Sequence, residues 1–194
     1  MAVNLVSFVG DTERATEHTC TTGEIRQWKT ILTRSIPRTA SLKRGPSSDT
    51  YFIFKITEVA QHRENETPIF TDAVYSYSQE RIVGMRIYPQ GVGSGRGTHV
   101  ALFIHMIKGD FDNSLVWPFR GTVTISVLDQ SCSRDQSDIS RIIQVKPNLT
   151  AFQQPREAIC RTGYGFKRFA PIEKFFGPQY VKDGELLLKI EFSG

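Results

Sequence analysis

Histidine and cysteine side chains are the groups most able to do chemistry, and in this chain they are dispersed. His99 and His105 share one face of a predicted strand, but six residues of strand separate them by about 20 Å, too far to hold one metal ion. Cys20, Cys132 and Cys160 follow no metal or redox spacing. We therefore expect no catalytic residues, no metal site and no cofactor, and a protein that is not an enzyme.

The glycine-rich run GVGSGRG, residues 91–97, is the one stretch that resembles a phosphate-binding loop. Its glycines fall at every second position and no Lys-Ser/Thr follows, so it fits neither the dinucleotide fingerprint nor the P-loop. Asp110 and Asp112 lie in a predicted turn, where capping is the usual role of a carboxylate. These residues indicate turn geometry and no nucleotide chemistry.

Charge and composition limit the kinds of partner that the chain is expected to bind. The chain of 194 residues carries a formal net charge of +4, but its basic residues are interspersed with acids and form no nucleic-acid-binding motif. The acid-free basic cluster at residues 34–44 is interpreted as a solvated tail. No window is apolar enough to span a bilayer, the first residues lack a secretory leader, and an odd number of cysteines favours reduced thiols. We expect a cytoplasmic protein that neither inserts in a membrane nor binds nucleic acid.

Two side chains are placed for binding by strand periodicity. In RIVGMRIY, residues 81–88, the apolar residues alternate, so Arg86 projects to the opposite face between Gly84 and Tyr88. In the strand at residues 98–107, Phe103 likewise points away from the more apolar face. Together they could hold an aromatic ligand by stacking and cation–π attraction, worth about 0.5–2 kcal/mol. The alternative is that Phe103 packs under a loop and Arg86 makes a surface ion pair.

The elements that position these residues are short alternating strands separated by turns every 8–15 residues. Almost no helix interrupts them after residue 50. This pattern predicts an all-β fold, an antiparallel β-sandwich of about eight strands, over residues 50–194. The clearest predicted strands cover residues 51–57, 69–78, 81–88, 98–107, 122–127, 141–145, 163–169 and 185–192. A polar loop is predicted at 61–67, and one helical turn is predicted near 171–179.

Residues 1–49 differ from the rest of the chain. Thr21 and Glu24 form a possible capping box, and Ile25, Trp28, Leu32 and Ile36 recur at helical spacing before a proline. An isolated helix this short is marginal in water, so it needs a partner. A flexible basic linker is predicted to follow, at residues 34–48.

Several separated motifs resemble one family, the C-terminal TRAF-C or MATH domain of the tumour necrosis factor receptor-associated factors. They occur in the family's order and cover roughly residues 50–192. The motifs are GMRIY (84–88), LFIHMIKGDFDNSLVWPF (102–119), TISVLDQS (124–131), KPNLTAFQQP (146–155), GYGF (163–166) and YVKDGELLLKI (180–190).

The resemblance implies a signalling adaptor domain that binds extended peptides by adding a strand to a sheet edge. The chain looks most like the branch that reads Pro-x-Glu-x-x-aromatic or acidic motifs in receptor cytoplasmic tails or adaptor proteins. In that branch, residues matching Arg86 and Phe103 contact the last motif position. A Gly-aromatic-Gly-aromatic strand pairs with the peptide and binds its Glu, and an apolar pocket receives its Pro. The matching strand residues are Gly163, Tyr164, Gly165 and Phe166, and the pocket residues are Ile143, Leu149, Thr150 and Ala151.

The chain departs from this branch at two places. Arg161-Thr162 replaces a Pro-Lys pair, which leaves Arg161 to supply a positive charge to the peptide's Glu, and Phe166 replaces a tyrosine. The family's trimers imply a possible homotrimer, for which the short N-terminal helix is the only candidate stub. The alternative function is a MATH-type substrate-recognition module of a ubiquitin system that binds Ser/Thr-rich degrons.

Overall fold

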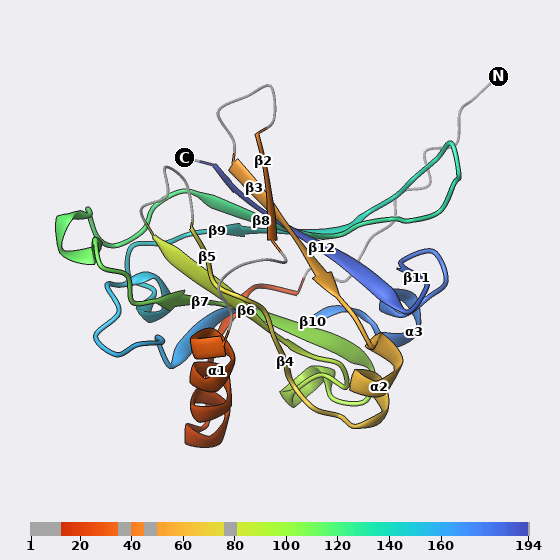
Figure 1. Cartoon of the computed structure of the whole chain (residues 1–194), viewed down its shortest axis with the longest axis horizontal. Coiled ribbons are helices and arrows are strands. Elements are labelled where there is room, and N and C mark those ends of the chain that lie inside the picture. The colour runs from red at the N-terminus through yellow and green to blue at the C-terminus, as the bar shows by residue number, and fades with distance from the viewer. Residues whose placement is uncertain (1–12, 35–39, 45–49, 76–80, 194) are drawn as a thin grey trace.

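Two antiparallel β-sheets packed face to face form the body of the protein (Figure 1). The computed structural model describes residues 13–34, 40–44, 50–75 and 81–193. Each sheet has six strands within these residues. The predicted antiparallel β-sandwich with a short N-terminal helix is thus confirmed.

The first sheet carries the face on which Arg86 and Phe103 lie. Its order is β1-β10-β7-β6-β4, with β5 also paired to β6. The strands are β1 (Thr16–Thr19), β4 (Ile69–Phe70), β5 (Val74–Tyr75), β6 (Ile82–Tyr88), β7 (His99–Ile107) and β10 (Thr162–Pro171).

The second sheet has the order β2-β3-β12-β8-β9, with β11 paired to β12. Its strands are β2 (Ala40–Arg44), β3 (Thr50–Ile56), β8 (Thr122–Val127), β9 (Ile139–Gln144), β11 (Val181–Lys182) and β12 (Glu185–Ser193). In the described part of the chain, three α-helices and three 3₁₀ turns connect the strands. They are α1 (Thr22–Arg34), α2 (Val59–Glu64), α3 (Ile172–Phe175), η2 (Gly93–Gly95), η3 (Asp112–Ser114) and η4 (Thr150–Phe152).

The main core lies between the sheets, as the period-two pattern of the strands requires. Alternate residues of β6, β7, β8 and β12 point inward and are almost fully buried. They include Val83, Met85, Ile87, Val100, Leu102, Ile104, Met106, Val123, Ile125, Val127, Leu186, Leu188, Ile190 and Phe192. A second, smaller core forms on the outer face of the first sheet, around Trp28.

Several local predictions differ from the structure. The predicted polar loop at 61–67 is largely helix α2, and the predicted strand at 69–78 is divided into β4 and β5, with residues 76–80 outside the described part. The predicted flexible linker at 34–48 contains β2, which pairs along β3. Backbone pairing covers the edge of β3 there, and it requires no apolar pattern in the sequence.

The predicted N-terminal helix exists and is capped as its sequence indicates. The Thr21 N–H donates to Glu24 Oε2 at 2.8 Å, and the Glu24 N–H donates to Thr21 Oγ1 at 3.2 Å, which is a capping box. Ile36, the last residue of the predicted helical pattern, lies outside the described residues.

The partner that this helix needs is the first sheet of the same chain. Trp28 is 0% exposed, its indole N–H donates to the Thr71 carbonyl at 3.2 Å, and its ring lies 5.2 Å from that of Phe70. Gly84 makes room for it, since a Cβ at that position would lie 2.5 Å from the Trp28 ring. Figure 1 shows α1 beside β6 on the outer side of the sheet.

We expect Gly84→Ala to loosen α1, because the added methyl overlaps the Trp28 ring and overpacking costs about 1–3 kcal/mol. The matched control is Gly23→Ala within α1, where a Cβ meets only Thr21 Oγ1, at 3.9 Å. Alanine favours helix over glycine by up to about 1 kcal/mol, so the control should tighten α1. Amide hydrogen exchange of residues 22–32 measures both changes, and equal exchange rates in the two variants would contradict this packing.

Candidate functional site

The outer edge of β10 is already covered by a strand from the same chain. β1 pairs with it antiparallel in the register Thr16↔Gly165, Glu17↔Tyr164, His18↔Gly163 and Thr19↔Thr162. The pairing continues one residue further, where the Cys20 N–H donates to the Arg161 carbonyl at 2.8 Å. We call the Gly163–Phe166 backbone, the Ala151 N–H, Phe103 and Arg86 the edge site, and residues 16–34 the β1–α1 segment.

Glu17 is held by a backbone donor beside the strand. The Ala151 N–H, in the short turn η4, donates to Glu17 Oε1 at 3.3 Å. The first N–H groups of a helical turn have no partner inside the turn, so they are suited to a carboxylate. The edge site therefore accepts an acidic side chain from an extended segment.

His18 lies over the sheet and links β1 to both predicted binding residues. Its ring stacks on Phe103 with centroids 4.7 Å apart and planes 28° apart, and Arg86 Nη2 donates to its Nδ1 at 2.9 Å. Accepting that bond requires an unprotonated Nδ1. Burial and the Arg86 charge lower the pKa of His18, although Glu24 acts in the opposite direction.

Arg86 is the most unusual group of the site, since its charged side chain is 0% exposed. It lies directly opposite Phe103 in the β6–β7 pairing, with its guanidinium 5.7 Å from that ring and 4.9 Å from the Tyr88 ring. Glu24 of α1 supplies the counter-charge at 3.2 Å. The Arg86 Nε is buried without a hydrogen-bond partner, so one donor of the guanidinium is still unused.

Around Arg86, the Glu24 carboxylate stays charged at neutral pH, and the Tyr88 hydroxyl and the Cys20 thiol stay neutral. Burial raises the pKa of Glu24, but hydrogen bonds from Tyr88 and Thr21 and the nearby Arg86 outweigh it, and the net shift is downward. Burial raises the pKa of Tyr88, and it raises that of Cys20 to about 11 in spite of Arg86. Cys20 is therefore a thiol at neutral pH and no nucleophile.

His105 lies beneath this cluster and has a structural role. It is fully buried against Trp28, with ring centroids 5.1 Å apart, and its Nδ1–H donates to the Cys160 carbonyl at 2.9 Å. Desolvation and Arg86 lower its pKa to about 3. Across the described residues, no three His, Cys, Asp or Glu side chains gather as a metal site would require.

The predicted strand residues of the edge site divide between the two faces of β10. Gly163 lies on the outer face, where a Cβ would come within 2.2 Å of His105 Nε2, and Gly165 has no room for one beside the Leu102 carbonyl. The Phe166 side chain is buried in the main core, and the Tyr164 side chain is half-buried against it beside Phe152. The glycines thus permit the close approach of β1.

The predicted pocket residues are only partly brought together. Ala151 contacts Glu17 as described, and Thr150 and Leu149 precede it in the same turn. Ile143 is 1% exposed and belongs to the main core on β9, so it is unavailable to a ligand at the edge. Arg161 pairs with Glu157 at 3.2 Å and offers β1 its carbonyl rather than its charge.

Sequence reasoning missed the residues that fill the site. Glu17, His18 and Cys20 lie in a polar stretch with no apolar alternation, and Glu24 was identified only as a cap. Arg86 and Phe103 do share the outer face, but the β1–α1 segment covers both. With the segment docked, Phe103 is packed under another part of the chain and Arg86 is in an ion pair. This arrangement matches the alternative interpretation of the sequence, except that the ion pair is buried instead of exposed.

We expect β1 to dissociate from β10 more readily as the pH falls from 7.5 to 5.5. Docked His18 has a pKa below its ordinary 6.5, because it is buried and faces Arg86 and Lys167, against Glu24 alone. The undocked form therefore binds more protons below about pH 6.5, and docking weakens there. Glu24, also lowered, adds to the loss only below its ordinary value of 4.5. Amide exchange of residues 16–20, corrected for intrinsic rates, measures this.

The matched control is His18→Phe, which retains a ring over Phe103 but cannot titrate. Its β1 protection should depend less on pH between 7.5 and 5.5 than that of the wild type, and the remaining dependence is assigned to His105, whose pKa is also lowered by burial against Trp28. An equal loss of protection in both proteins would show that another group is responsible.

Comparison with known proteins supports one family. Bovine (Bos taurus) and human (Homo sapiens) TNF receptor-associated factor 6 are each 31% identical over 148 residues, 73% of this chain. The chain spans only 27% and 28% of those proteins. The solved structure of Notothenia coriiceps TRAF5 superposes with a TM-score of 0.67 at 31% identity, covering 74% of this chain and 73% of that one.

The family match falls on the sandwich. The sequence model of the TRAF/meprin, MATH domain family matches residues 66–189, which include β6, β7 and β10 with Arg86 and Phe103. The β1–α1 segment precedes the matched residues. No helix in the described part of the chain is long and apolar enough to cross a membrane. By its motifs, its sandwich and these matches, the chain belongs to the TRAF/MATH domain family.

Proposed function

We propose that this chain is the non-catalytic peptide-binding domain of a signalling adaptor, and that it binds extended segments of receptor cytoplasmic tails or adaptor proteins at the edge site. The adaptor role follows from the family. The observation that carries the binding mode is that β10 already pairs with an extended segment, residues 16–19, which contains Glu17.

The contacts of that segment indicate what a ligand would need. Backbone pairing with β10 gives affinity through main-chain hydrogen bonds, which carry little sequence preference. Selectivity then comes from the Ala151 N–H, which takes a glutamate, and from Phe103 and Arg86, which suit an aromatic or acidic side chain.

Further room for a ligand exists where β10 begins. A surface pocket of about 380 Å³ borders Thr162 and Arg161, and the half-buried Cys160 lies on its wall. Ligand residues beyond the paired strand would meet Gln153 and Pro155 there.

A single peptide of this length buries less than the standard interface area of about 1,200 Å² or more, so weak binding is expected. Oligomerisation, for example as a homotrimer, would raise avidity for clustered ligands by about 10²–10⁴ when the geometry allows simultaneous engagement.

The test is a titration of the full chain with a Pro-x-Glu-x-x-aromatic peptide, followed by amide chemical shifts. We expect micromolar binding with shifts at residues 163–166, at Ala151 and at residues 16–20, which the peptide has to replace on β10. The same peptide with its Glu replaced by Ala should bind more weakly, since it cannot accept from the Ala151 N–H. Phe103→Leu should weaken binding roughly two- to tenfold, the value of one lost aromatic contact.

Two results would contradict the proposal. Selective binding of a Ser/Thr-rich peptide would favour the substrate-recognition module instead. Saturable binding with no shifts on β10 would place the ligand elsewhere on the domain.

A further inference from the structure

We propose that the β1–α1 segment is a tethered competitor, which occupies the edge site of its own chain and must leave before another peptide can bind. The inference rests on the proposed function and adds its regulation. It concerns residues that precede the family match at 66–189.

Occupation by β1 and by an external strand is mutually exclusive. β1 pairs with four successive β10 residues, Thr162 to Gly165, and a strand edge offers each N–H and C=O group only once. Glu17 takes the Ala151 N–H, and His18 covers Phe103. Because Phe103 and Arg86 are both 0% exposed, no external side chain reaches either while β1 is docked.

The segment is nevertheless an incomplete ligand. The strand itself presents Cys20 to Arg86, and a thiol is a weak hydrogen-bond acceptor. The carboxylate that pairs with Arg86 comes from Glu24 on α1 instead, and the Arg86 Nε remains without a partner. A ligand with a carboxylate or an aromatic ring at the Cys20 position would use Arg86 more fully, so the competitor is displaceable.

Tethering compensates for these weak contacts. A segment joined to its site through a short connection competes at an effective concentration in the millimolar range. α1 adds an anchor away from β10, since Trp28 packs over Gly84 and Phe70. Released from the sheet, a 13-residue helix is marginal in water, so undocking is expected to unfold α1 as well.

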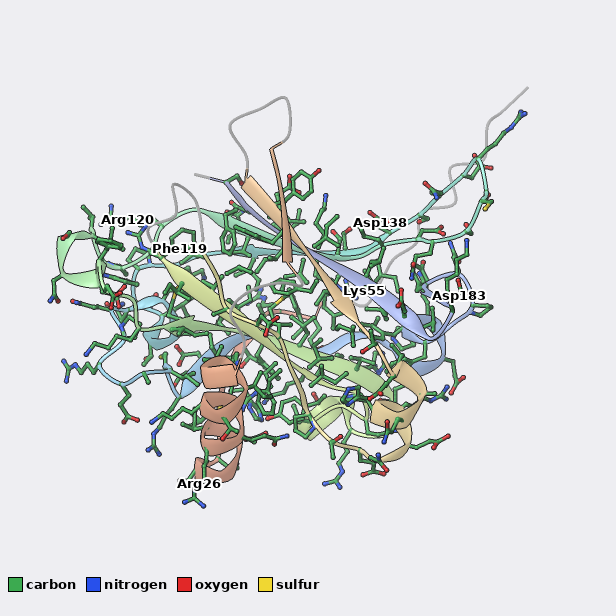
Figure 2. The ribbon with its side chains drawn as sticks, viewed as in Figure 1. Arg26, Lys55, Phe119, Arg120, Asp138 and Asp183 are labelled. Atoms are coloured by element: carbon green, nitrogen blue, oxygen red, sulfur yellow. The ribbon has the colours of Figure 1, made fainter. Side chains whose placement is uncertain are left out.

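This separation of anchor and edge site allows the competitor to be weakened without altering the site. Trp28→Ala removes the anchor and leaves β10, Ala151, Phe103 and Arg86 unchanged. The matched control is Arg26→Ala on the exposed side of α1, where Figure 2 shows Arg26 pointing away from the sheet.

We expect Trp28→Ala to bind the Pro-x-Glu-x-x-aromatic peptide at least about tenfold more tightly than wild type, which corresponds to a segment docked in about 90% or more of wild-type molecules. Arg26→Ala should match wild type. Fluorescence anisotropy of the labelled peptide gives the affinities, and circular dichroism in the strand region confirms that the sandwich is retained.

The wild-type chain provides a test that needs no substitution. Saturating peptide should abolish the exchange protection of residues 16–20 and of α1, while β6 and β7 remain protected. This result identifies displacement even if Trp28→Ala fails to fold.

The outcomes separate the inference from the proposed function. Equal peptide affinity in wild type and Trp28→Ala, with residues 16–20 still protected when the peptide is bound, overturns the inference alone. If neither protein binds peptide although residues 16–20 exchange freely in Trp28→Ala, the proposed function fails and the competitor has nothing to exclude.

Discussion

The arrangement on the outer face of the first sheet depends on a positive charge that has no access to water. Burying an unpaired charge costs several kcal/mol, so the buried Arg86 requires a counter-charge and hydrogen-bond acceptors. The sandwich itself supplies two aromatic rings, Tyr88 and Phe103. The carboxylate and the imidazole acceptor come from Glu24 and His18 of the β1–α1 segment. Docking of that segment and burial of the charge are therefore one event.

The sequence predicted the sandwich because the side chains of most strands alternate between apolar and polar along the chain. The alternation from Val100 to Met106 places the same residues in the core as the structure does, and the Thr21–Glu24 cap lies where it was predicted. β1 gave no such signal, because backbone pairing with β10 holds it and its side chains are polar. The fit between Trp28 and Gly84 joins positions 56 residues apart, and no local pattern reveals it.

The sequence predicted several residues of the candidate site, but it did not predict that the β1–α1 segment occupies the site. Strand periodicity correctly put Arg86 and Phe103 on one face, and Gly163 and Gly165 lie where a second backbone approaches closely. Ile143 could not be separated from the pocket residues by sequence, because an apolar residue on an edge strand suits a pocket and a core equally well. That the site is filled depends on long-range contacts of residues 16–34, and sequence patterns carry no information on those.

Helix α1 has one apolar face, and Ile25 and Trp28 on it are buried against the sheet. The same side chains cannot also be buried between helices of neighbouring protomers. Assembly through α1 and occupation of the edge site by another peptide are thus thermodynamically linked, and the linkage is reciprocal. Under the proposed competition, a partner that captures the apolar face of α1 would raise the affinity of the edge site for external peptides. A peptide that fills the edge site would make α1 available for association by the same factor.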